Sequence, residues 1–319
     1  MTALYRPVEL TREDAELLAE LMTRANPDEP EDPVVQLHAL FNPTPGYARE
    51  RFVLEIEGQS VGVARHGHPL KATPDSYAGS RVALVPEARS VAALVHAYGF
   101  LETRVRAAGV RTLTTHVLED DDDQRLALEQ CGWTKDRVSK VWELDLVAGR
   151  ERILAMAAET REAAARLGIR CLPLAAETDP QRYEKIHDMG ERAAQDIPTT
   201  LPIPRGELAE FMAQLASPDL SEDRFWIAKD GDRYAGLSHL RYPPVRGNVW
   251  TGYTATAPEY RGRGIAKAVK METLVQAIEL GITRVRTDND SENAPMLHIN
   301  EQLGYTSLPA LASYLKRLE

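Results

Sequence analysis

The sequence has only two cysteines, Cys131 and Cys171, which are too few for a framework of disulfide bonds. Neither has a cysteine or histidine nearby at metal-ligand spacing, so we expect two small buried side chains and no metal site. No apolar run approaches the roughly 20 residues that a bilayer requires. Glu9, Glu13 and Asp14 come before any apolar segment typical of a secretory signal. We therefore expect a cytoplasmic protein without a membrane partner.

The chain also lacks an excess of positive charge. It has 38 lysines and arginines against 48 aspartates and glutamates, a formal net charge of −10. Nonspecific binding to nucleic acid needs clustered cations, so this balance disfavours a nucleic-acid partner. The acidic run Glu119 to Asp123 lacks the pattern of an EF-hand and indicates a solvated loop. His66 and His68 alternate along an expected strand without a third ligand, so they predict no metal site.

A tandem repeat organises the 319 residues, about twice the ~150 residues of a typical domain. The residues from Val85 onward run parallel to those from Ala257 onward. Four identities, each separated by 172 residues, hold this register without a gap: Pro86 and Pro258, Arg89 and Arg261, Gly109 and Gly281, Gly132 and Gly304. The chain is therefore two copies of one fold.

Each copy predicts the same element order. An N-terminal strand and helices are followed by two or three antiparallel strands, a strand that ends at Pro86 or Pro258, a long helix, a strand, a short helix and a final strand. This order predicts an α+β fold in which each copy has a mixed, mostly antiparallel sheet flanked by helices. We expect a first domain over residues 1–150, a linker helix over 151–168 and a second domain over 169–319.

The long helix of the second copy is predicted over residues 263–280. Its apolar positions recur at helical spacing, and Lys267, Lys270, Glu272 and Glu279 are expected on the polar side. Gly281 is expected to end the helix, because glycine readily takes the positive φ of that position. Residues 283–287 then predict a strand.

The turn before this helix carries the strongest functional signal. Residues 261–266 read RGRGIA, and they link the strand that ends at Pro258 to the helix. Glycines permit close backbone approach, and the first amides of a helix lack intrahelical acceptors. With Arg261, Arg263 and Lys267 nearby, the turn predicts an anion site suited to a pyrophosphate. It has neither the Walker A spacing nor the GxGxxG spacing of a dinucleotide turn.

This region closely resembles the acetyl-CoA-binding core of the GNAT acyltransferase superfamily. The resemblance rests on Pro258, residues 261–266, Asn289, Asn293 and the phrase MLHINEQLGY at 296–305. Residues 261–266 satisfy the motif [QR]-x-x-G-x-[GA] of that family. The resemblance covers the second copy and, in decayed form, the first. It is similar to the tandem actinobacterial-type members, and it implies two tandem GNAT-like domains.

The resemblance implies acetyl-CoA as acyl donor, with roles for named residues. The strand before the loop would splay from its neighbour and offer backbone groups to the pantetheine arm and the thioester carbonyl. The loop would cradle the pyrophosphate, and Asn293 would hydrogen-bond the pantetheine or phosphate region of the cofactor. The implied cofactor-binding residues are Thr254, Ala255, Thr256, Arg261, Gly262, Arg263, Gly264, Ile265, Ala266, Asn293 and Asn300. A neutral amine would attack the thioester directly in a ternary complex.

Two positions depart from the family pattern. Asn300 stands where many members have a tyrosine that protonates the departing thiolate, and an amide cannot supply that proton. The strand at 248–256 has no carboxylate, although many members carry a glutamate there. The catalytic residues are therefore left open, with Asn300, Tyr253 and Tyr305 as candidates. Other groups considered for acid chemistry or a proton relay are Tyr314, Asp288, Asp290, Glu292 and His239.

The first copy has lost the features of the loop. Ser90, Val91 and Ala92 replace Gly262, Arg263 and Gly264. Asp121 stands where the second copy has Asn293, and a carboxylate there would repel an anionic cofactor. We expect one acetyl-CoA per chain, bound by the second copy. The proline-rich residues 195–207 either shape the acceptor pocket, as the resemblance implies, or form a stiff connecting loop.

These features predict an N-acetyltransferase that acts on an amine of a small molecule or peptide. One alternative is a non-catalytic acyl-CoA sensor or interaction protein, which the missing tyrosine and carboxylate favour. Another is a mycothiol-synthase-like acetyltransferase, also a tandem protein, although its expected tyrosine-containing phrase is absent. The acceptor and the oligomeric state are left open.

Overall fold

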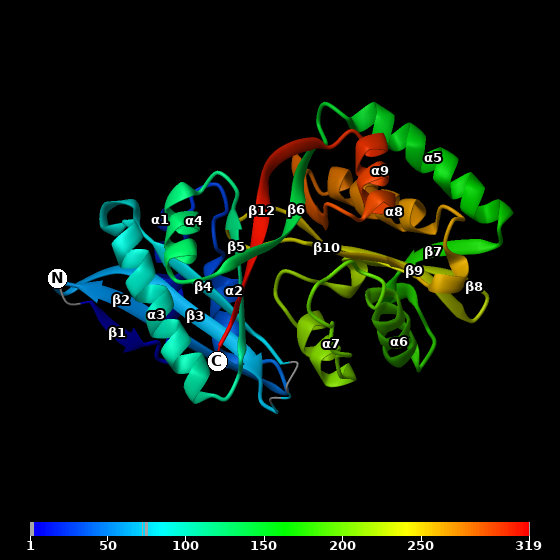
Figure 1. Cartoon of the computed structure of the whole chain (residues 1–319). Helices are drawn as coiled ribbons and strands as arrows, with labels where there is room; N and C mark the ends of the chain where they lie inside the picture. Colours follow the sequence, from blue (N-terminus) through cyan, green and yellow to red (C-terminus); the bar gives the residue numbers. More distant parts are fainter. Residues whose placement is uncertain (1–2, 72, 74–75, 319) are drawn as a thin grey trace.

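The computed structural model describes residues 3–71, 73 and 76–318 (Figure 1). Its strands are β1 (Leu4–Pro7), β2 (Tyr47–Ile56), β3 (Gln59–Pro69), β4 (Ala78–Leu84), β5 (Thr112–Leu118), β6 (Thr134–Asp145), β7 (Ile169–Pro173), β8 (Phe225–Asp230), β9 (Arg233–Arg241), β10 (Trp250–Thr256), β11 (Arg284–Asp290) and β12 (Thr306–Arg317). Its α-helices are α1 (Arg12–Ala25), α2 (Pro33–Phe41), α3 (Val91–Ala107), α4 (Asp122–Gln130), α5 (Arg150–Arg166), α6 (Arg182–Ala194), α7 (Leu208–Leu215), α8 (Ile265–Glu279) and α9 (Ala294–Leu303).

Within these described residues the twelve strands form one sheet, in the order β1-β2-β3-β4-β5-β12-β6-β11-β10-β9-β8-β7. Neighbouring strands are antiparallel except for the pairs β4–β5 and β10–β11, which are parallel. The predicted mixed, mostly antiparallel sheet flanked by helices is thus confirmed. The strands of the two sequence copies join in a single continuous sheet.

The last strands of the two copies are exchanged. β12, the end of the second copy, pairs with β5 of the first, from Leu311 opposite Leu118 to Arg317 opposite Thr112. β6, the end of the first copy, pairs with β11 of the second. β12 and β6 also pair with each other, and they lie side by side near the centre of the molecule (Figure 1). Each copy therefore completes the strand array of the other.

Alternation along the strands gives the sheet two covered faces. In β2 and β3, Val53 and Val63 pack in a cluster with α1, whereas the adjacent Leu54 and Ala64 pack in a cluster with α3 and α4. Successive side chains of a strand point to opposite faces, which explains the division. In the second copy, α6 and α8 both contact β9 and β10.

The long helix of the second copy is confirmed as α8, but its predicted polar side is wrong for two residues. Both residues are buried: Glu272 faces α5, which packs against α8, and Lys270 faces Asn300 of α9. Arg161 of α5 binds both carboxylate oxygens of Glu272 at 2.7 and 2.6 Å. Gly281 follows the helix with φ +76°, as its role at the helix end requires.

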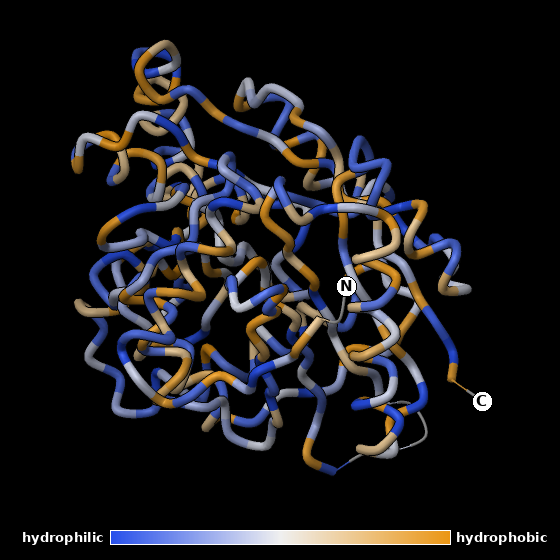
Figure 2. The backbone as a smooth tube through the Cα atoms, turned by 90° about the vertical axis from the view of Figure 1, so that its left-hand side faces the viewer, coloured by the Kyte–Doolittle hydropathy of each residue, from blue (hydrophilic) through white to orange (hydrophobic). Residues whose placement is uncertain are grey.

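The described part of the chain contains no cluster of three or more histidine, cysteine, aspartate or glutamate side chains that could hold a metal ion. The rings of His66 and His68 stack 5.8 Å apart, so the two side chains share a face of β3. Among the helices of the described segments, none is long and apolar enough to cross a membrane. Figure 2 shows hydrophilic and hydrophobic stretches alternating along the backbone.

Candidate active site

A cavity of about 910 Å³, here called the β10–β11 cavity, opens where these two parallel strands diverge. Their register consists of the single pair Trp250 and Arg286. Beyond that pair β10 stays bonded to β9, and β11 to β6, so the facing edges have backbone amides and carbonyls free for a ligand. Thr254, Ala255 and Thr256 line the cavity along one of these edges.

The loop before α8 closes one end of this cavity. Gly262 and Gly264 have φ of +71° and +80°, a backbone conformation that side chains disfavour. Gly264 is the N-cap of α8 and provides no side chain to accept from the first amides of the helix. A Cβ atom added at either glycine would meet no atom within 4 Å, so the space above them belongs to the cavity. The loop therefore presents unpaired amides to an open space.

The three expected cations of the loop have different positions. Arg261 and Lys267 line the cavity, whereas Arg263 is not among the lining residues and lies over the ring of Tyr260, 5.3 Å from its centroid. Arg261 forms an ion pair with Asp196 at 2.5 Å, and both side chains are about half exposed. The positive N-terminus of α8 and two cations thus meet at this end of the cavity.

Residues 192–305 match the sequence model of the acetyltransferase (GNAT) family. The chain contains a GNAT acetyltransferase domain. This domain spans the loop, α8, β10 and β11, which form part of the cavity wall. No curated protein sequence matches the chain significantly.

Solved structures place both copies in the same fold. The tandem GNAT protein from the clavulanic acid biosynthesis pathway is 18% identical with a TM-score of 0.74, and the match covers 99% of this chain and 98% of that chain. A GCN5-related N-acetyltransferase from Sphaerobacter thermophilus is 15% identical with a TM-score of 0.69, covering 99% and 95%. A glucosamine N-acetyltransferase region of a fungal multi-domain β-N-acetylglucosaminidase is 13% identical with a TM-score of 0.66, covering 98% and 38%. At these identities the likeness establishes the fold.

The two asparagines singled out from the sequence lie differently in the GNAT domain. Asn293 lines the cavity as the N-cap of α9, and its side-chain oxygen accepts from the amide of Met296 at 3.4 Å. Asn300 is fully buried and is not among the lining residues. Its side-chain NH₂ donates to Oδ1 of Asn289, a lining residue, at 2.6 Å. Asn300 therefore lies one residue behind the cavity wall.

Lys270 is the unforeseen partner of Asn300. Its Nζ donates to Oδ1 of Asn300 at 3.0 Å and lies 5.0 Å from the ring centroid of Tyr305. Burial lowers the pKa of Lys270 to about 7, and the charge of Asp288 acts against this shift. No sequence pattern indicates this contact, because Lys270 sits at a position that a helical pattern assigns to solvent.

The tyrosine candidates also differ in whether they line the cavity. Tyr253 lines the cavity, its hydroxyl donates to the carbonyl of Gly190 at 3.3 Å, and burial raises its pKa to about 12. Tyr305 and Tyr314 are buried, and neither lines the cavity. Burial raises the pKa of Tyr305 above its ordinary value. Of the three tyrosines, Tyr253 is the one that can meet a ligand in the cavity.

The groups considered as proton relays likewise differ in whether they line the cavity. Asp288 and Asp290 line the cavity, and Arg137 binds both oxygens of Asp290 at 2.7 Å and Glu292 at 2.6 Å. This charge pairing lowers the pKa of Asp290, whereas burial raises that of Asp288. His239 is buried against Phe225, outside the lining, and burial lowers its pKa to about 3.

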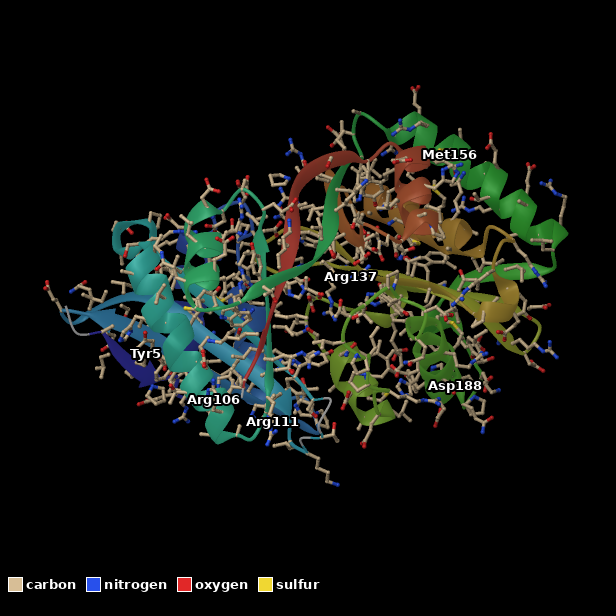
Figure 3. All side chains as sticks on the ribbon, in the orientation of Figure 1. Tyr5, Arg106, Arg111, Arg137, Met156 and Asp188 are labelled. Atoms are coloured by element: carbon tan, nitrogen blue, oxygen red, sulfur yellow. The ribbon has the colours of Figure 1, made fainter. Side chains whose placement is uncertain are left out.

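Sequence reasoning missed the contribution of the first copy to this cavity. Tyr77, Thr114, His116, Arg137 and Ser139 all line it. Arg137 lies centrally in the molecule in Figure 3. Desolvation lowers the pKa of His116, and the charge of Asp288 acts in the opposite direction. No local pattern could have revealed these residues, because the strand exchange brings them to the GNAT domain.

The proline-rich residues 195–207 also reach the cavity. Its lining includes Asp196, Ile197, Pro198, Thr199, Leu201 and Ile203. The hydroxyl of Thr200 donates to Asp136 of β6 at 2.6 Å, which ties the segment to the first copy. The segment thus forms part of the cavity wall.

The corresponding loop of the first copy is closed by its own side chains. Ser90 caps α3, and its hydroxyl accepts from the amide of Ala93 at 3.2 Å. Arg89 forms ion pairs with Asp121 and Asp123. The helix N-terminus and the one retained cation are therefore both engaged within the protein.

Proposed function

We propose that this chain is an acetyl-CoA-dependent N-acetyltransferase whose second domain transfers an acetyl group to the amine of a small molecule or peptide. The observation that carries the proposal is the β10–β11 cavity, closed at one end by unpaired amides and cations. Acetyl-CoA needs both features, because its pyrophosphate is anionic and its pantetheine arm pairs with backbone groups. The likeness to acetyltransferase structures supports the same reaction.

The binding residues follow from their positions on the wall. Gly262, Gly264, Ile265 and Ala266 would hold the pyrophosphate through backbone amides, with Arg261 adding charge. Thr254 to Thr256 would pair with the pantetheine arm and hold the thioester carbonyl near backbone donors, which stabilises the oxyanion of the transition state. Acetyl-CoA supplies the activated acyl group. The side-chain NH₂ of Asn293 would donate to the cofactor.

Two cavity residues have the chemistry for the proton steps. An amine is protonated at neutral pH and must lose a proton before it attacks. His116 can accept that proton, because a lowered pKa keeps its imidazole neutral at pH 7. Tyr253 can donate to the departing thiolate, because its raised pKa keeps it protonated. The transfer would then proceed by direct attack, without an acyl-enzyme.

We propose the predicted domain division together with one cofactor site. Residues 1–150 form a degenerate domain, 151–168 a linker helix and 169–319 the catalytic domain. The engaged Ser90 and Arg89 support a first copy without a pyrophosphate site. Its strands β5 and β6 instead provide His116 and Arg137 to the catalytic cavity.

The deciding experiment measures CoA release from acetyl-CoA with a panel of amines, aminoglycosides and peptide N-termini. We expect turnover with at least one acceptor. Tyr253→Phe should then lower kcat by roughly 10²- to 10⁴-fold, the usual contribution of general acid catalysis. As a matched control, Tyr314→Phe removes a hydroxyl outside the cavity and should leave kcat unchanged.

The competing function is an acyl-CoA sensor. Its support is the burial of Asn300 behind the wall and the absence of a carboxylate from β10 in the described residues. Tight binding of acetyl-CoA without release of CoA across the whole panel would favour the sensor. Lack of binding would reject both functions.

A further inference from the structure

A second cavity, of about 970 Å³, lies on the α1–α2 face of the first copy and is called here the arginine cavity. The second copy closes it with Asp219, Arg241, Pro243, Asn248 and Trp250. Its arginine-bearing wall is formed by β2, β3 and β4 of the first copy, and Trp250 at the start of β10 reaches it from the second copy. Thr114 and His116 line both cavities.

Three arginines stand directly opposite one another across adjacent strands of this cavity. Arg51 of β2 pairs with Arg65 of β3, and Arg65 pairs with Arg81 of β4. Arg49 lies two residues before Arg51, on the same face of β2. Like charges at directly opposite positions destabilise a sheet. Six arginines line the cavity, and four of them, Arg49, Arg51, Arg65 and Arg81, stand together on three adjacent strands, where their charges need compensating anions.

The carboxylates that line the cavity form an ion pair with Arg81 but none with Arg49, Arg51 or Arg65 in the described residues. Glu31 pairs with Arg81 of the row, and the other carboxylates in the lining bind partners outside these four arginines: Glu29 binds Arg286, Asp32 binds backbone amides, Asp121 binds Arg89 and Asp219 binds Arg241. Arg51 donates to the carbonyl of Ala39 at 3.2 Å. Arg49 lies 5.6 Å from the ring centroid of Tyr47.

Arg65 is the clearest unmatched group. Across residues 3–71, 73 and 76–318 it has neither a hydrogen bond nor an ion pair, although it lines the cavity. Burial and the charges of Arg81, Arg51 and Arg49 lower its pKa to about 10, and the charge of Glu31 acts against this shift. A guanidinium that remains charged in this setting provides five N–H donors with no protein acceptor.

The second copy shows that the fold does not require arginines here. Gly62 of β3 lies opposite Leu84 of β4, and Gly236 of β9 lies opposite Thr256 of β10. These equivalent pairs align β3 and β4 of the first copy with β9 and β10 of the second. By this correspondence the row Arg51, Arg65 and Arg81 matches Phe225, His239 and Tyr253. The second row packs by ring contacts, with Phe225 and His239 stacked at 4.8 Å. The arginine row is therefore specific to the first copy.

We propose that the arginine cavity binds a small molecule with two or more carboxylate or phosphate groups, held by Arg65 with Arg51 and Arg49. A planar guanidinium offers two parallel N–H donors to either kind of oxyanion. Such a ligand would neutralise the arginine row and occupy the donors of Arg65. This site does not depend on acetyl transfer.

The test uses the full chain with citrate and inorganic pyrophosphate as probes, followed by isothermal titration and thermal unfolding. At least one probe at millimolar concentration should raise the Tm of the wild type. A response to citrate alone indicates a carboxylate ligand, and a response to pyrophosphate alone a phosphate ligand. Gly264→Val should keep the response, which separates this site from the loop of the GNAT domain.

Arg65→Gln and Arg51→Gln provide the decisive comparison. Each should weaken probe binding roughly tenfold to a hundredfold, the range for losing a charged hydrogen bond. In the absence of probe, Arg65→Gln should raise the Tm, because it relieves the repulsion in the row. A merely structural arginine would lower the Tm instead. Arg111→Gln is the matched control, at an exposed residue outside the cavity lining (Figure 3).

Three results would overturn the proposal. Unchanged probe binding in both Arg65→Gln and Arg51→Gln would place the anion elsewhere. An equal loss of probe binding in Arg111→Gln would show that the effect depends on the total charge of the protein and not on the arginine cavity. Absence of stabilisation by either probe, with a lowered Tm of unliganded Arg65→Gln, would assign the arginine row to folding.

Discussion

At the residue scale, Gly264 combines a positive φ with open space above it. Gly264→Val should abolish acetyl-CoA binding, because the side chain enters the space proposed for the pyrophosphate. Isothermal titration should give about one site per wild-type chain and none in the variant. The strained backbone should also cost roughly 1–3 kcal/mol of unfolding free energy.

Gly281 provides the control for that strain. It has φ +76° at the opposite end of α8 and lies outside the cavity lining. Gly281→Val should therefore lose comparable stability and still bind acetyl-CoA. Equal loss of binding in both variants would mean that general destabilisation, rather than the loop, is responsible.

The ion pair of Arg261 and Asp196 predicts two effects of opposite sign. Arg261→Ala should weaken acetyl-CoA binding about tenfold or more, since it removes one charge-assisted contact and leaves the backbone amides in place. Asp196→Ala should tighten binding, because it removes an anion and releases Arg261 for the ligand. Titration at low ionic strength will measure both effects. A change of acetyl-CoA affinity in the same direction in both variants would show that Arg261 does not contact the cofactor.

At the scale of elements, Asn300 joins α9 to α8 and β11 through Lys270 and Asn289. Asn300→Ala would leave the buried Nζ of Lys270 without its acceptor and should cost roughly 1–3 kcal/mol of unfolding free energy. Because Asn300 is not among the cavity lining residues, kcat should change only modestly. Chemical denaturation and CoA release will separate the two effects. A thousandfold loss of kcat in a stable variant would instead identify a catalytic role.

The elements that the sequence predicted well are those with a local signal. Periodicity and Gly281 place α8 to within two residues, and Gly168 ends α5 with φ +73°. The burial of Lys270 and Glu272 has no such signal, because it depends on the packing of α9 and α5, respectively, against α8. The loop at 261–266 was recognisable since glycines and cations share a short segment. The cavity residue His116 was not, because its neighbours are distant in sequence.

At the scale of the molecule, the strand exchange escaped prediction for a physical reason. β6 and β12 are equivalent ends of two similar copies, so either could complete either array. Local pattern identifies a strand but not which partner it joins. The observed register, with Asp290 opposite Ser139 and Leu311 opposite Leu118, decides the matter.

The exchange predicts that a cut between the copies will not separate them. A protease site inserted at the exposed Val147, in the turn before α5, should be cleaved without loss of the native structure. The two pieces should elute together in gel filtration and unfold in one transition, because β6 and β12 hold them to each other. A matching site inserted at the exposed Val245, within the second copy, controls for the effect of the insertion. Elution as two separate species after the cut at Val147 would contradict this expectation.

The strand order has a further consequence for the history of the chain. The strands β1 to β6 of the first copy are equivalent to β7 to β12 of the second, and with this matching the order reads identically from either edge of the sheet. The centre of the order lies between the antiparallel strands β12 and β6. A two-fold axis generates this arrangement, so a one-copy ancestor would have formed a homodimer by swapping its last strand. The stability of such a dimer depends on protomer concentration. Joining two such copies in one chain through α5 would remove that dependence and would allow each half to diverge on its own.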